Sequence, residues 1–401
     1  MNPGLKSKIA LYFHEGKTMK SKYNLLVIFF SFCALSPSAG YTDEGDWDIN
    51  TAYRLAAASE CSYYTSSKKS VRDCFKKHID NSRENGKKAL AIFQDLNDGA
   101  IDILTPDAIN AAILVKTGDD LIIAFRGTEL IPQDWGNNFH LSDFKNIIIR
   151  FFQRELNKIY ENERHKGFNE SLTSLTREIK EKDNWKSLIQ NSSGKTLYLT
   201  GHSKGGALAT GATVDYKNDL KDLNFRGSIV TYTFEAARFF TAAGIDSNSS
   251  KLNEIWRFEY QHDPVPHAPL GEITYRRLVE QRDKMLALEE KSSKTFGEIA
   301  TLIANMAMFH LLGTIGLPYD EIDRNNFNFL PAGKLAYVDS ENKLCLPNNQ
   351  CEKYDEYKNY EERFKESVQK NAENANVIHP LKFLIDQHSE GYLRSIKNEI
   401  N

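Results

Sequence analysis

Residues 197–208 read Leu-Tyr-Leu-Thr-Gly-His-Ser-Lys-Gly-Gly-Ala-Leu, and they carry the strongest structural signal in the chain. The first four are apolar and β-favouring, as in a buried parallel strand. Residues 201–205 then spell G-x-S-x-G, and small residues dominate the following turns. Strand, sharp turn and helix together predict a nucleophile elbow, which lifts the Ser203 hydroxyl above a sheet at a helix N-terminus. A glycine-rich turn with an idle serine is the alternative.

Length and composition set the class of protein. The chain has 401 residues, of which 41% are hydrophobic, and a formal net charge of -3. It can bury a substantial core, either in one large α/β domain with insertions or in two ordinary domains. The near-neutral charge provides no argument for a nucleic-acid partner.

The N-terminal region has the organisation of a targeting signal. Residues 25–35 form an apolar run, with two lysines shortly before it and the small residues 38–40 after it. This order is typical of a signal peptide, and the run is too short to span a bilayer comfortably. We expect residues 1–40 to be a signal peptide with an upstream extension, cleaved near Gly40, and residues 41–401 to be one secreted domain. An uncleaved N-terminal anchor is the alternative.

Four of the five cysteines lie outside that apolar run. They form two local pairs, Cys61 with Cys74 and Cys345 with Cys351. An even number in a secreted chain suggests disulfides, and the local pairing is chosen because each pair closes a short loop. Reduced, buried thiols are the alternative. The spacing of cysteine and histidine offers no zinc-ligand pattern, so no metal is expected.

Strand-like and helix-like segments alternate along the first two thirds of the chain. This alternation predicts an α/β fold with a mainly parallel sheet and helices on both faces. The expected strands are 89–93, 108–115, 121–125, 197–200, 228–234 and 254–260, and the expected helices include 49–64 and 172–188.

A serine nucleophile needs a base, and the base needs an orienting carboxylate. After a nucleophile elbow the chain order is serine, acid, histidine. Asp263 follows a predicted strand and is held by two prolines in the next three residues, although a turn-capping role is the alternative. Among the later histidines, His267 is too close to the acid, His310 lies in an apolar segment and His379 precedes a proline. His388 is therefore the best candidate for the base.

Five short motifs, weak singly but informative in this order, resemble the class 3 lipases, fungal-type α/β-hydrolases that act on ester bonds of lipids. The resemblance covers about residues 49–275 and the end of the chain. The motifs are Ile123-Ala124-Phe125-Arg126-Gly127-Thr128, His165-Lys166-Gly167-Phe168, Gly201-His202-Ser203-Lys204-Gly205-Gly206, Asp263-Pro264-Val265-Pro266 and His388-Ser389-Glu390-Gly391-Tyr392.

The resemblance implies a role for each matching residue. Ser203 would be the nucleophile, Asp263 the orienting acid and His388 the general base. Thr128 and Lys204 would form the oxyanion hole, in part through backbone N–H groups.

Two further segments follow from the same comparison. A lid is expected at residues 130–152, after the oxyanion strand. Residues 276–378 are longer than a simple connection needs, and we expect a large helical insertion there, before the catalytic histidine. It could serve as a second cap, an acyl-binding wall or a membrane-docking face.

The expected function is that of a secreted serine ester hydrolase acting on acyl lipids at a lipid–water interface. It would work through an acyl-enzyme, with transient membrane-surface contact and without metal or cofactor. Phospholipase A1, a soluble carboxylesterase and a feruloyl esterase are alternative activities. An inactive hydrolase fold used for binding is the alternative from another class.

Two positions depart from the family pattern. Residue 204 is Lys, where the family more often has an uncharged residue, so the ammonium would either favour an anionic headgroup or reach solvent. Residues 233–238 (Thr-Phe-Glu-Ala-Ala-Arg) match a strand-end motif that usually carries Gly and Pro. We therefore expect a different local turn there.

Overall fold

The computed structural model describes residues 47–84, 89–118, 120–128, 163–182, 195–222, 227–260, 263, 265–267, 328–339, 343–347 and 396. All of them belong to the compact unit that spans residues 43–401. The expected signal peptide lies outside the described residues. No helix within the described part of the chain is long and apolar enough to cross a membrane.

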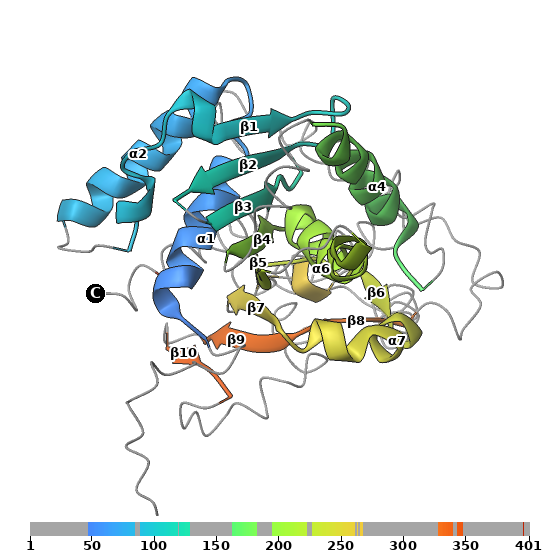
Figure 1. Cartoon of the computed structure of the whole chain (residues 1–401). Coiled ribbons are helices and arrows are strands. Elements are labelled where there is room, and N and C mark those ends of the chain that lie inside the picture. Colours follow the sequence, from blue (N-terminus) through green and yellow to red (C-terminus); the bar gives the residue numbers. More distant parts are fainter. Residues whose placement is uncertain are drawn as a thin grey trace, which may run out of the picture. The chain divides into compact units, whose positions relative to one another are not determined.

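An eight-stranded sheet forms the centre of this unit, in the order β1-β2-β3-β4-β5-β7-β9-β10 (Figure 1). The five strands from β3 to β9 pair in parallel, and β1, β2 and β10 add antiparallel edges. The strand bounds are β1 Ile101–Leu104, β2 Ala112–Thr117, β3 Asp120–Phe125, β4 Thr196–His202, β5 Ser228–Phe234, β7 Ile255–Tyr260, β9 Lys334–Val338 and β10 Leu344–Cys345. A separate antiparallel pair joins β6 (Phe240–Thr241) to β8 (Phe329–Leu330).

Each face of the sheet carries its own apolar core, because alternate side chains of a strand point to opposite faces. Helices α1 (Ile49–Cys61) and α2 (Lys68–Glu84) pack on one core, and α4 (Lys166–Glu181) and α6 (Lys204–Asp222) pack on the other. Figure 1 shows these two sets of helices on opposite sides of the strands. Helix α7 (Ala242–Leu252) follows β6. The predicted α/β fold is confirmed.

Four parallel strands bring the candidate site residues to one edge of the sheet. β3, β4, β5 and β7 are neighbours and run in the same direction, so their carboxyl ends share an edge of the sheet. The segments that follow these strands begin with Arg126, Ser203, Glu235 and the turn to Asp263. Open α/β sheets bind their ligands at this edge.

One local prediction is wrong. Residues 89–93 were expected as a strand, but Ala91–Phe93 form a 3-10 helix whose buried Phe93 packs on Phe75.

The helical insertion predicted at residues 276–378 lies largely outside the described residues. Its described part, residues 328–339 and 343–347, contains β8, β9 and β10. The last four residues of β9 are buried and the strand pairs with β7, so the sheet determines its structure.

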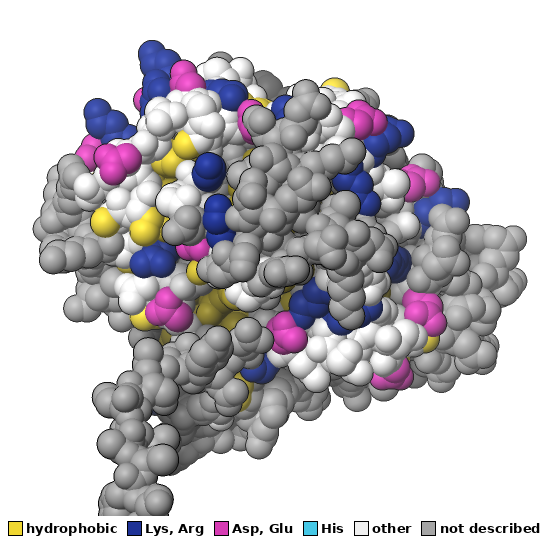
Figure 2. Space-filling view, viewed as in Figure 1, with side chains coloured by type: hydrophobic (Ala, Val, Ile, Leu, Met, Phe, Trp, Pro, Cys, Tyr) yellow, Lys and Arg dark blue, Asp and Glu magenta, His cyan; other side chains and the backbone are white. Residues whose placement is uncertain are grey.

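A disulfide joins the first two helices. Cys61 at the end of α1 bonds to Cys74 in α2, which confirms this predicted pair. Cys345 in β10 is also disulfide-bonded, but its predicted partner Cys351 lies outside the described residues. The described surface shown in Figure 2 carries Lys and Arg side chains interspersed with Asp and Glu, in keeping with the small net charge of -3.

Candidate active site

Ser203 lies in the turn between β4 and α6 in a left-handed backbone conformation, with φ 60°. This conformation is costly for a residue with a side chain. Its backbone is tied on both sides, because its N–H donates to the Phe234 carbonyl at 3.0 Å and its carbonyl accepts from Gly206 N at 3.0 Å. The turn thus holds the serine at the N-terminus of α6, as a nucleophile elbow does.

The glycines that flank the serine are required by close packing. A Cβ at Gly201 would lie 2.2 Å from the Gly205 carbonyl carbon. A Cβ at Gly205 would lie 2.0 Å from the Phe125 carbonyl oxygen. Each clash is with backbone, which cannot rotate away. The G-x-S-x-G spacing therefore follows from the tight crossing of β4, α6 and the end of β3.

The loop after β3 is held by a tyrosine that the motif search did not find. The Tyr63 hydroxyl lies 2.9 Å from His202 Nδ1 and also accepts a hydrogen bond from the Gly127 backbone N–H. Burial raises the pKa of Tyr63, so the phenol stays neutral and its proton is directed to His202. A Cβ at Gly127 would lie 2.0 Å from this hydroxyl oxygen.

Thr128 comes next in that loop. Its Oγ1 is buried and has no hydrogen-bond partner among the described residues. The preceding Arg126 donates to Thr65 Oγ1 and to the Ile109 carbonyl, each at 3.1 Å. The loop is thus fixed by its neighbours while one hydroxyl is left for a ligand.

Asp263 follows β7 and is 2% exposed. Its N–H donates to the Tyr260 carbonyl at 3.1 Å, and its Oδ1 accepts from Val265 N at 2.9 Å. It therefore caps a turn while its carboxylate stays inside the protein.

Residues 122–272 match a family model described as lipase (class 3). This segment of the chain is similar to the class 3 lipases, and the similarity supports an ester hydrolase. The matched segment runs from β3 through the elbow to just beyond Asp263, so it covers every described element of the site except Tyr63.

Solved lipase structures give weaker overlaps with this chain. Lipase II from Rhizopus niveus is 16% identical with a TM-score of 0.34, over 55% of this chain and 74% of its own. M37 lipase is 15% identical with a TM-score of 0.48, over 88% and 95%. The Rhizomucor miehei lipase–propeptide complex is 20% identical with a TM-score of 0.32, over 55% and 62%. Values this low carry no argument about substrate or site. No curated protein matches the chain.

Four of the five predicted site residues lie at the same sheet edge. Thr128, Ser203 and Asp263 follow β3, β4 and β7. The backbone N–H of Lys204 is at the first residue of α6, beside Ser203. The predicted base His388 and the predicted lid at 130–152 lie outside the described residues.

The side chain of Lys204 is buried. It is 2% exposed, and its Nζ donates to Asn110 Oδ1 at 2.9 Å. Hydrogen bonds from the backbone N–H groups of Asn110 and Ile109 lower the pKa of Asp107, and the Lys204 ammonium adds to this lowering. It thus lies inside the protein beside the 107–110 loop, and it does not reach solvent.

The motif at residues 165–168 has a structural role. His165 caps α4, with its Nδ1 accepting from Phe168 N at 3.2 Å. The ring stacks on the Phe168 ring with centroids 4.1 Å apart. Burial lowers the pKa of His165 to about 3, so the imidazole is neutral and can act as an acceptor.

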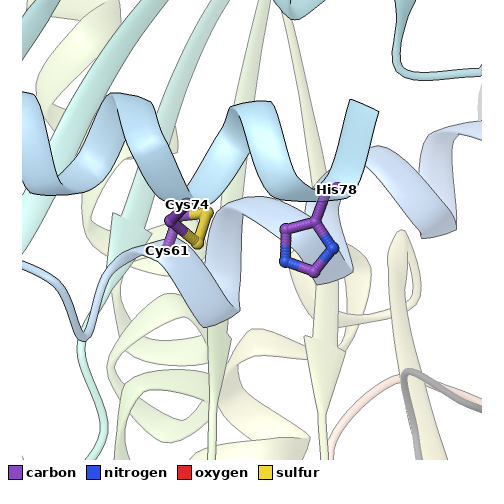
Figure 3. Close-up of side chains that lie close together, drawn as sticks. All are labelled: Cys61, Cys74 and His78. Atoms are coloured by element: carbon purple, nitrogen blue, oxygen red, sulfur yellow. A yellow bond between two sulfur atoms is a disulfide. The ribbon is translucent and has the colours of Figure 1, made fainter. Parts of the chain in front are cut away.

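One cluster in the described part of the chain has the residue types of a metal site. Cys61, Cys74 and His78 lie close together, with the two sulfur atoms joined (Figure 3). His78 Nε2 is 3.1 Å from Glu60 Oε2, although not aligned for a hydrogen bond. Sulfurs in a disulfide are not thiolate ligands, so this oxidised cluster does not fit a metal ion.

Proposed function

We propose that the chain hydrolyses carboxylic esters of acyl lipids through a triad of Ser203, His388 and Asp263. The observation that carries the proposal is the strained backbone of Ser203 between β4 and α6, with glycines at 201 and 205. A strained turn persists only where the surrounding structure holds it, and such turns are concentrated at functional sites. If Ser203 had no catalytic role, its strained backbone would cost stability without any functional gain.

The reaction would proceed in two halves. Ser203 Oγ attacks the ester carbonyl while His388 takes its proton, and the alcohol leaves with that proton. Water then gives a proton to His388 and attacks the acyl-enzyme, which releases the fatty acid and restores Ser203. Asp263 would orient His388 and stabilise its imidazolium.

The oxyanion would accept hydrogen bonds from donors at two positions, Lys204 and Thr128. The Lys204 backbone N–H begins α6, where the helix dipole favours negative charge. The Thr128 hydroxyl is buried and unpartnered among the described residues, and its backbone N–H would be the other donor. One such donor is worth about 3 kcal/mol of transition-state stabilisation.

Secretion is part of the proposal. The Cys61–Cys74 disulfide supports an oxidising compartment, because disulfides persist mainly in secreted proteins. It agrees with the signal peptide expected at residues 1–40, with cleavage near Gly40. N-terminal sequencing of the secreted chain would test the cleavage site.

Covalent labelling tests the nucleophile. A fluorophosphonate should label the wild-type chain and fail to label Ser203→Ala. Ser250→Ala, at an exposed position of α7, is the matched control and should label normally. Equal labelling of Ser203→Ala would contradict the proposal, and the absence of labelling in the wild type would favour the inactive binding protein.

Substrate preference separates the enzyme alternatives. Fatty-acid release would be measured from emulsified triacylglycerol, from phospholipid vesicles and from a soluble short-chain ester, with Ser203→Ala beside each. We expect the highest rate on triacylglycerol. A preference for vesicles would instead indicate a phospholipase, and activity only on the soluble ester would indicate a carboxylesterase.

A further inference from the structure

A second buried carboxyl lies behind the proposed triad acid. Glu235 is the first residue after β5 and is completely buried. Its two carboxyl oxygens make no hydrogen bond of ordinary geometry within the described structure, although the Asp263 carboxyl lies within hydrogen-bonding reach. Glu235 lies in the 233–238 segment, whose resemblance motif usually carries Gly and Pro. It has no role in the mechanism described above.

The fold forces this contact. β5 and β7 are neighbouring parallel strands, and Glu235 N donates to the Phe258 carbonyl of β7 at 2.9 Å. Glu235 has a φ of 47°, a left-handed conformation that is uncommon for a residue with a side chain. The chain thus accepts local strain at the position that aligns this carboxyl with Asp263.

Two buried carboxyls in contact cannot both be ionised at low cost. Burial raises the pKa of Glu235 well above its usual value, and the charges of Asp263 and Glu259 raise it further. Arg257 pairs with Glu259, and the Tyr260 backbone N–H opposes the rise only weakly. Glu235 therefore keeps its proton in the folded chain. Asp263 accepts a backbone hydrogen bond from Val265.

We propose that Glu235 is a positioning residue whose protonated carboxyl donates a hydrogen bond to the Asp263 carboxylate and holds it in place for His388. The inference rests on the proposed function of Asp263. A neutral donor behind the acid would fix the carboxylate without cancelling its charge, which still stabilises the imidazolium. An apolar site can keep a carboxyl neutral in this way so that it donates a hydrogen bond, as in the active site of ketosteroid isomerase.

Glu235→Gln and Glu235→Leu separate the donor from the packing. The Gln amide can donate to Asp263 and cannot ionise, so we expect kcat within about threefold of wild type. The Leu variant keeps the volume and loses the donor, so we expect kcat to fall about tenfold to a hundredfold with KM little changed. Glu181→Gln, at the exposed end of α4, is the matched control. A fully active Leu variant, or a folded Gln variant as slow as the Leu variant, would overturn the proposal.

Stability against pH gives a readout that does not depend on catalysis. The unfolded Glu235 loses its proton near its ordinary pKa, whereas the folded residue keeps it to much higher pH. Wild-type stability should therefore fall as the pH rises from about 4.5 through the folded pKa. Glu235→Gln removes that loss, so it should be more stable than wild type at pH 8 and the gain should vanish near pH 4.5. A gain that does not change with pH would contradict a protonated Glu235.

Measuring the effect of Glu235→Gln in the Asp263→Asn variant separates a failure of this inference from a failure of the proposed triad. In Asp263→Asn, the neighbouring negative charge is removed and the stability gain from Glu235→Gln at pH 8 should shrink. If Asp263→Asn leaves hydrolysis intact, the triad assignment fails while this coupling still reports the contact between the two carboxyls. If the coupling is absent and Asp263→Asn is inactive, the triad stands and the role of Glu235 is refuted.

Discussion

At the scale of single residues, one buried hydroxyl joins two parts of the proposed site. The Tyr63 hydroxyl accepts from the Gly127 N–H and contacts His202 Nδ1 at 2.9 Å. It connects the segment after α1 to the elbow and to the loop after β3. A residue far from every motif in sequence thus contributes to the shape of the proposed oxyanion hole.

Replacing Tyr63 by Phe should loosen the oxyanion loop. The change leaves the Gly127 N–H without its acceptor, at a cost of about 1 kcal/mol of stability. We expect kcat to fall about tenfold, equivalent to about 1.4 kcal/mol of activation free energy, with KM nearly unchanged. Tyr64→Phe, at the next tyrosine, is the control in steady-state ester hydrolysis. A loss confined to KM would show that Tyr63 acts on substrate binding instead.

His165 makes stability depend on acid pH. Its pKa in the folded chain is about 3, while the unfolded imidazole titrates near 6.5. Because the unfolded state takes up its proton first, stability should fall as the pH drops from about 6.5 toward 3. His165→Asn keeps a capping acceptor for Phe168 N and cannot titrate in this range.

Denaturant midpoints measured between pH 4 and 8 would test this. The wild-type midpoint should decline in acid more steeply than that of His165→Asn. Parallel pH profiles would mean that His165 is not the group responsible.

At the scale of elements, the disulfide joins α1 to α2 beside the segment that carries Tyr63. Cys61 and Cys74 are separated by 13 positions. Closing a loop of about that length is worth about 3 kcal/mol in the chain-entropy account. The pair thus stabilises the layer that covers one face of the sheet and the turn that reaches the elbow.

The double variant Cys61→Ala/Cys74→Ala should lose about 2–4 kcal/mol of unfolding free energy in urea. Reductant should lower the stability of the wild type by a similar amount. Because Cys345 is also disulfide-bonded, the double variant treated with reductant is the control that isolates the second bond. A double variant as stable as wild type would show that α1 and α2 are held by packing alone.

At the scale of the whole molecule, one sheet joins segments that are distant in sequence. β7 ends at Tyr260, and its neighbour β9 begins only at Lys334. β9 completes the core on the α1 face, where Ala336 and Val338 are fully buried. The stability of the proposed acid turn after β7 therefore depends on a strand from the segment that sequence analysis expected to be helical.

Ala336→Asp places a charge in that core without removing the strand. A buried, unpaired carboxylate should cost about 3 kcal/mol or more and lower the urea midpoint accordingly. Lys343→Ala, at an exposed position just before β10, should have little effect. A small effect of Ala336→Asp would mean that β9 contributes little to the fold.

Sequence by itself determined the local chemistry of the elbow and the alternation of strands and helices. The elbow depends on contacts between residues that are close in sequence, such as Gly201 against Gly205. The G-x-S-x-G pattern between an apolar run and a small-residue helix therefore predicts it from sequence alone. The Cys61–Cys74 pair was likewise readable from spacing.

Tertiary structure alone decided the contacts between distant strands. Nothing in the sequence around Glu235, Tyr63 or Lys204 shows what their side chains meet, because those partners come from other strands and loops. β9 was missed for the same reason, since a short apolar run becomes a strand only when a neighbour such as β7 supplies its hydrogen bonds. Pairing between strands that are distant in sequence brings these buried polar side chains to their partners. That pairing exists only in the folded chain.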